Sequence, residues 1–142
     1  MGDIYPSQAL AMLREQHDQL RVLADECEAL AAPVAADREI TTDLRRAVAK
    51  LRIAWEAHNR YEESVLAPIL LATDAFGELR VEEMVRGHRH EHVLVRSTMT
   101  PTTVRELRSV LALLRRHLAE EEAFFLTNRI VRDDLVTLEA SG

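Results

Sequence analysis

Seven histidines and glutamates are spaced along the chain so that they could share one metal site. They are one isolated histidine and three pairs four residues apart, namely His17; His58 and Glu62; His88 and His92; His117 and Glu121. Side chains four residues apart project from the same face of an α-helix, about one turn from each other. Imidazole nitrogens and carboxylate oxygens, without a thiolate among them, suit iron, manganese or zinc. The spacing therefore predicts a metal centre, and we assign no catalytic residue or organic cofactor besides it.

Four amphipathic helices are needed to bring these residues together, and the hydrophobic pattern predicts them. Apolar residues recur at alternating spacings of three and four over about residues 6–31, 42–72, 78–98 and 101–138. Thr41 begins a cap signal before the second helix, and Pro101 fits the first turn of the last one. No linker divides the chain. We therefore expect an all-α protein, with a single domain over residues 1–142 that folds as an up-down-up-down antiparallel four-helix bundle.

The inward-facing stripe of each predicted helix is apolar except near one level, where the seven residues lie. A buried ionised carboxylate costs several kcal/mol unless it is paired or ligated, and an unpartnered imidazole is also unfavourable in a core. A shared cation would stabilise all of them. Trp55 and Phe124 are expected on the metal-facing stripes, and Cys27 is expected in the core as a small apolar residue.

The two halves of the chain resemble each other around these residues. The matching residues are His58, Glu62 and Glu63 in the first half and His117, Glu121 and Glu122 in the second. His17 corresponds loosely to His88. This pattern suggests a duplicated helical hairpin and a nearly two-fold symmetric site.

The neighbours of the seven residues are expected outside the ligand set. Glu63, Glu91, Glu120 and Glu122 should be solvated or should orient imidazole N–H groups. His90 is two residues from both His88 and His92, which turns it away from them on a helix of about 3.6 residues per turn. We expect His90 at the surface.

The number of donors exceeds what one ion would use, since zinc alone usually takes four. Two ions bridged by Glu62 and Glu121 would use all seven residues, with the histidines as terminal ligands. A bridging oxo or hydroxo group from solvent would then leave one coordination position open. Oxygen or another small ligand could bind there.

With these motifs in this order, the sequence resembles the hemerythrin-like family, also called the HHE cation-binding domain, over essentially its whole length. The segment HNRYEESVLAPIL, residues 58–70, is especially typical. The resemblance implies a non-haem di-iron centre inside a four-helix bundle, the architecture of myohemerythrin. By the family pattern, one iron would be bound by His88, His92 and His117, the other by His17 and His58, and both would be bridged by Glu62 and Glu121.

One spacing departs from the oxygen-carrying members of that family. They usually place an Asp five residues after the last histidine, whereas here Glu121 follows His117 by four residues and Glu122 by five. Many bacterial members with the shorter spacing are regarded as sensors, iron-handling proteins or stress proteins. The departure weighs against reversible oxygen carriage more than against the iron site.

The resemblance implies a protein that binds oxygen or a related small ligand, such as peroxide or nitric oxide, for sensing, storage or stress response. This interpretation leans away from an enzyme. Two alternatives stay open. One is a di-iron oxidoreductase, acting as oxidase, peroxidase or nitric oxide reductase, and the other is an iron storage or delivery protein.

Composition weighs against several other classes. The chain has 142 residues, of which 30% are charged, and a net charge of -6. No apolar run reaches the ~20 residues of a membrane span, and nucleic-acid binding normally needs a basic patch. A single cysteine allows no internal disulfide, and the first residues lack a signal-peptide pattern. We therefore expect a cytoplasmic protein without a membrane or nucleic-acid partner.

Overall fold

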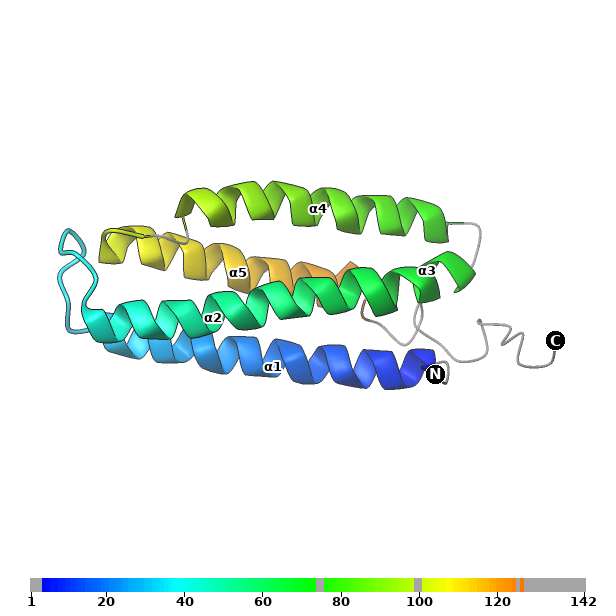
Figure 1. Ribbon diagram of the computed structural model, residues 1–142, viewed down its shortest axis with the longest axis horizontal. Helices are drawn as coiled ribbons and strands as arrows, with labels where there is room; N and C mark the ends of the chain where they lie inside the picture. Colours follow the sequence, from blue (N-terminus) through cyan, green and yellow to red (C-terminus); the bar gives the residue numbers. More distant parts are fainter. Residues whose placement is uncertain (1–3, 74–75, 99–100, 125, 127–142) are drawn as a thin grey trace.

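The chain folds into long helices that run along one common axis (Figure 1). The computed structural model describes residues 4–73, 76–98, 101–124 and 126, and the side chains of these residues except 73 and 90–98. Over these ranges the regular elements are all helices, and the only strand-like feature is an isolated antiparallel bridge between Glu39 and Thr103. The expected all-α class is confirmed.

The elements in chain order are α1 (Pro6–Ala31), α2 (Thr42–Tyr61), the π-helical segment η1 (Glu62–Leu66), α3 (Ala67–Thr73), α4 (Gly77–Thr98) and α5 (Val104–Phe124). The backbone stays helical from α2 through η1 into α3, so these three elements form one continuous rod. The described chain therefore packs as a bundle of four long rods. In Figure 1 the end of α1, the start of α2, the end of α4 and the start of α5 lie at one end of the bundle, and the end of α3 and the start of α4 lie at the other.

The first three predicted helices agree closely with the observed bounds, but the last one does not. α5 begins at Val104 rather than at residue 101, because the preceding residues bond to the α1–α2 loop. The amide of Ile40 donates to the carbonyl of Thr102 at 3.2 Å, and the amide of Val104 donates to the carbonyl of Arg38 at 3.1 Å. These bonds place both loops at the same end of the bundle.

The end of α5 is also earlier than predicted. The helix stops at Phe124, and the amide of Leu126 donates to the carbonyl of Glu121 at 2.9 Å, which closes a wider turn. This turn brings Leu126 into the core, where it is 2% exposed. The expectation of a helix running through this residue is therefore wrong, and residues 127–138 lie outside the described residues.

The π-helical segment η1 has a local cause in Pro68. Proline has no amide hydrogen, so it cannot donate the usual helical bond to the carbonyl four residues before it. Just before it, the amide of Ala67 donates to the carbonyl of Glu62, five residues back, instead of continuing the α-helical register. Single π turns of this kind are frequent at functional sites. Here the turn begins at one of the seven predicted ligands.

The apolar core consists of two clusters separated along the bundle axis. One contains residues from the far part of α1, the first part of α2 and most of α5, including Leu20, Leu51 and Leu107. The other joins the start of α1 to η1, α3 and α4, and includes Leu13 and Leu70. In the sequence, His17 of α1 and both His58 and Glu62 of the second rod lie between residues of the two clusters, as the stripes predicted.

One stripe position was predicted wrongly. Phe124 is 66% exposed, because α5 ends there and the chain turns away before Leu126. The other aromatic stripe residue, Trp55, is buried at 3% exposure, and Cys27 is fully buried. Burial raises the pKa of the Cys27 thiol to about 11. Its expected role as a small core residue fits this environment.

Among the described residues, no helix combines the length and the apolar character that crossing a bilayer requires.

The start of α2 gives a direct test of the local structure. The hydroxyl of Thr41 accepts a hydrogen bond from the amide of Leu44 at 3.2 Å, the geometry of a helix N-cap. We expect Thr41→Ala to lower the free energy of unfolding by about 1 kcal/mol, measured by urea denaturation. The matched control is Thr42→Ala, one residue inside the helix, which should leave stability nearly unchanged. Equal losses in the two variants would contradict the cap.

Candidate metal centre

Six of the seven predicted ligands meet in the middle of the bundle. They are His17, His58, Glu62, His88, His117 and Glu121, and all six side chains are buried. They come from α1, from the α2–η1 junction, from α4 and from α5. The side chain of His92, the seventh, lies outside the described residues, as does that of His90. The structure thus assembles ionisable groups from all four rods at one level.

The six residues form two overlapping groups that could each hold a metal ion. One group is His17, His58, Glu62 and Glu121, and the other is Glu62, His88, His117 and Glu121. Within each group, one potential ligand atom per residue lies within 4.8 Å of all the others. Both carboxylates belong to both groups. A shared pair of carboxylates between two sets of histidines is the arrangement that bridging of two ions requires.

Each carboxylate contacts histidines from both halves of the chain. Glu62 Oε1 lies 2.6 Å from His58 Nε2 on the same rod and 3.7 Å from His88 Nε2 on α4. Glu121 Oε1 lies 2.6 Å from His117 Nε2 on α5 and 3.4 Å from His58 Nε2. The two glutamates therefore lie between the histidines and connect the two groups.

The outward nitrogens of three histidines are held by fixed polar partners. His17 Nδ1 lies 3.1 Å from Glu122 Oε1, and His88 Nδ1 lies 3.0 Å from Glu63 Oε1. These contacts confirm the expectation that Glu63 and Glu122 orient imidazole rings. They also show the internal symmetry directly, because each first-helix histidine is held by the glutamate that follows the central carboxylate of the other half.

The third held ring uses a residue that the sequence pattern did not single out. His58 Nδ1 lies 2.7 Å from Gln16 Oε1, one residue before His17. Arg21 was also missed, and it binds Glu122 Oε2 at 2.7 Å. The signal for both is their place on α1, at the residue before and four residues after His17. Arg21 lowers the pKa of Glu122, burial opposes this, and His17 adds to the lowering.

These partners fix where the ring protons are. Glutamate and glutamine oxygens accept hydrogen bonds, so the Nδ1 atoms of His17, His58 and His88 must donate. In a neutral imidazole the other nitrogen then carries a lone pair. All three Nε2 atoms point inward, and those of His17 and His58 face each other at 3.2 Å. Two lone pairs at that distance repel each other unless a positive charge lies beside them.

The pKa values of the ionisable groups are shifted both by burial and by neighbouring side chains. Burial raises the pKa of Glu62, but its contacts with His58 and His88 outweigh this and lower the pKa to about 2. Burial lowers the pKa of His17, and the neighbouring His58 lowers it further. Burial also lowers the pKa of His88, yet the carboxylates of Glu62 and Glu63 raise it above its usual value. The centre thus combines an ionised carboxylate with at least one neutral ring.

Several buried atoms of the centre lack a hydrogen-bond donor or acceptor. Among the described side chains, both oxygens of Glu62, Oε2 of Glu121 and Nε2 of His88 are buried without a hydrogen-bond partner. Unsatisfied polar atoms are rare in folded proteins and often mark an ion or a functional site. These atoms are oxygens and a bare imidazole nitrogen, which are ligands for iron, manganese or zinc. The residues present therefore fit a bound metal.

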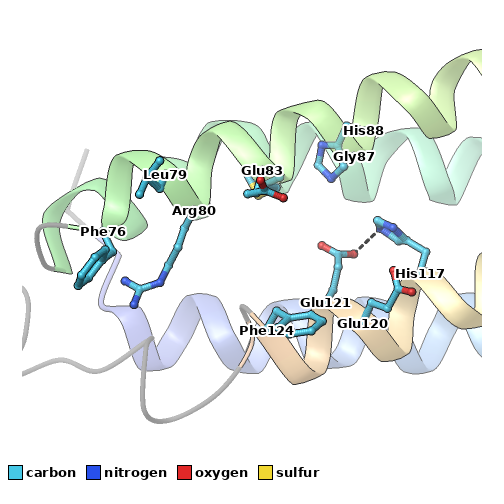
Figure 2. Close-up of a pocket in the computed structure, with 11 residues that line it drawn as sticks. Phe76, Leu79, Arg80, Glu83, Gly87, His88, His117, Glu120, Glu121 and Phe124 are labelled. Atoms are coloured by element: carbon cyan, nitrogen blue, oxygen red, sulfur yellow. Dashed lines mark ion pairs between the residues drawn. The ribbon is translucent and has the colours of Figure 1, made fainter.

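Trp55 packs beside the centre without joining it. Its ring centroid lies 5.0 Å from that of His117. His117 and His88 approach each other across the space between α4 and α5, and Glu121 lies beside them (Figure 2). The tryptophan belongs to the first apolar cluster and packs against His117, in agreement with its expected packing role.

The tautomers give a prediction that can be checked by NMR. We expect His17, His58 and His88 to carry their proton on Nδ1, because each Nδ1 faces an acceptor oxygen. Two-bond ¹H–¹⁵N correlation spectra of the rings should show a protonated Nδ1 and a bare or metal-bound Nε2. An Nε2–H tautomer, with the ring proton directed at Glu62 or Glu121 instead, would contradict this assignment.

Comparison with known proteins agrees with this geometry. The model of the hemerythrin HHE cation-binding domain matches residues 8–127. Searches of curated proteins and of solved structures found no match. The matched range contains all seven predicted ligands and covers most of the chain. The chain therefore belongs to the hemerythrin HHE cation-binding domain family.

Proposed function

We propose that this protein is a non-haem di-iron protein that binds oxygen or a related small ligand at a carboxylate-bridged centre. The proposed ligands are His17, His58, Glu62, His88, His92, His117 and Glu121. Glu62 and Glu121 would bridge the ions, with an oxo or hydroxo group from solvent as a further bridge. The bundle around them would be an up-down-up-down four-helix domain, and the single cysteine favours a cytoplasmic location.

The observation that carries this proposal is that two groups of buried donors share both carboxylates. Two ions, one in each group, would use all of these donors, whereas a single ion would leave some of the histidines without a metal. Carboxylates also favour hard cations and stabilise the higher oxidation states of iron, while the imidazoles suit iron as well as zinc. When bound, the iron pair would supply an oxygen-binding redox centre with an open coordination position.

The protein side chains would prepare the centre for this role. Glu63, Glu122 and Gln16 hold three rings with their Nε2 atoms turned inward. Fixed outer partners of this kind raise ligand basicity and keep the ring orientation. The two apolar clusters exclude water from both ends of the centre. A small ligand would therefore meet histidine rings that are already oriented to hold the metal.

The proposal is tested by loading the protein anaerobically with ferrous iron and then admitting air. We expect two irons per chain and a new absorption band that disappears when oxygen is removed. An enzyme would instead consume oxidant repeatedly with a reductant present, and a storage protein would exchange its metal readily. Far fewer than two irons per chain would overturn the proposal.

Removing either proposed bridge should abolish the paired-iron spectrum. We expect this for Glu62→Ala and for Glu121→Ala, because each carboxylate belongs to both donor groups. Mössbauer spectra of the loaded proteins would report the loss. His90→Gln is the control, since the sequence spacing turns His90 away from the ligands, and it should keep the paired signal. An unchanged spectrum in both alanine variants would contradict the bridging role.

Glu122, which orients His17, should affect metal affinity measurably but less than a direct ligand does. We expect Glu122→Ala to weaken metal affinity by about 10-fold to 100-fold, as outer-shell substitutions typically do. Competition with a chelator of known affinity measures this change. Glu120→Ala, at an exposed neighbouring position on α5, is the matched control and should keep the original affinity. Equal affinities in the two variants would show that the contact between Glu122 and His17 does not support the site.

A further inference from the structure

A cavity of about 540 Å³ lies between α4 and α5 and reaches the candidate centre. His88, His117 and Glu121 form its inner wall, and Leu79, Met84 and Phe124 are among the apolar residues that line the rest. Figure 2 shows the rings of His88 and His117 at one end of this space and Phe76 at the other. The cavity is much larger than a diatomic molecule needs, since one water in the liquid occupies about 30 Å³.

Among the described residues this cavity is lined by His88 and His117, and a second cavity beside α2, η1 and α4 is also lined by His88, but neither is lined by His17 or His58. His88 and His117 keep 5% and 7% of their surface exposed, whereas His17 and His58 keep 0% and 1%. On the second side Gln16 covers the outer edge of His58, and Glu122 with Arg21 covers His17. Small molecules that enter through this cavity therefore arrive at His88 and His117.

The surroundings of His17 and His88 differ at the residue that precedes each histidine. Gln16 precedes His17 on α1, and Gly87 precedes His88 on α4, so the internal repeat makes them equivalent positions. Gln16 fills its side with an amide that holds His58. Gly87 has no side chain and lines the cavity. A side chain at residue 16 therefore fills the space in the first half of the repeat, whereas the equivalent space at residue 87 stays open.

The backbone does not require glycine at this position. Gly87 lies inside the α4 helix, and a Cβ atom built there would meet nothing within 4 Å. By contrast, a Cβ at Gly77 would collide with the backbone carbonyl of Leu70. Glycine is also among the least favourable residues inside a helix. The absence of a side chain at residue 87 leaves part of the cavity volume open.

We infer that the cavity between α4 and α5 admits a small organic molecule to the centre and that Gly87 sets the size limit. This inference rests on the proposed function. Ligand pockets of about 300–1,000 Å³ are typically apolar with a few converging polar groups. This cavity has that character, with its polar groups at the inner end. The ligand class is therefore a compact aromatic or alkyl molecule with one oxygen-bearing head group directed at His88 and His117.

The test uses zinc-loaded full-length protein, which is redox-silent, and 4-fluorophenol as the probe. Binding is followed by ¹⁹F NMR for the original chain, Gly87→Ala, Gly87→Leu and Glu82→Leu. We expect the leucine at position 87 to raise the Kd about tenfold or more, because it would occupy the probe's volume. We expect a smaller rise, about threefold, for Gly87→Ala. Glu82→Leu places the same leucine side chain at an exposed position of α4 outside the cavity and should leave the Kd unchanged.

The outcomes separate this inference from the function on which it rests. Zinc content is measured in the same samples, together with the iron content of iron-loaded protein. Protein that binds no metal overturns the proposed function and this inference with it. Metal-loaded protein that does not bind the probe, or binds it equally in all variants, overturns only the inference. If Gly87→Leu does not fold, Gly87→Ala decides, because its methyl group meets open space.

Discussion

The structure depends on how bare imidazole nitrogens and carboxylates face each other in a buried core. Three rings donate outward through Nδ1, so their Nε2 lone pairs point at one another and at Glu62 and Glu121. Such a cluster is unfavourable by itself, since buried unpaired charge costs several kcal/mol. Positive charge between the groups removes the repulsion and satisfies the orphaned oxygens. Metal binding and folding would then be coupled, as in other proteins whose ligands meet only in the folded state.

Three features of the bundle position the groups of the centre: the contact between two loops, the wide turns after Glu62 and Glu121, and the internal repeat. The paired loops at one end of the bundle set how far α2 and α5 are shifted relative to each other, which brings His58 and His117 to the same depth. The turns after Glu62 and Glu121 are both wider than an α-turn, and each closes on a carbonyl five residues back. The internal repeat then supplies matching outer partners. The repeat is broken at residue 87, where glycine stands in place of a glutamine and lines the cavity beside His88 and His117.

Much of this could be predicted from the sequence because the controlling signals are local. The three-and-four spacing placed His17, His58, Glu62, His88, His117 and Glu121 on buried faces, and the cap signal at Thr41 located the start of α2. Other features depend on contacts between distant segments, which periodicity does not report. The exposure of Phe124 follows from the early end of α5, and the late start of that helix follows from its bonds to the α1–α2 loop. Gln16 was missed because its place beside His17 identifies its partner only when the facing helix, which carries His58, is known.

We propose that two cations lie between the buried histidines and share Glu62 and Glu121. Crystals of the iron-loaded protein, measured on both sides of the iron absorption edge, test it most directly. The account predicts two anomalous peaks inside the bundle, one beside His17 and His58 and the other beside His88 and His117, with both carboxylates between them. A single peak, or iron bound only at the protein surface, would contradict it.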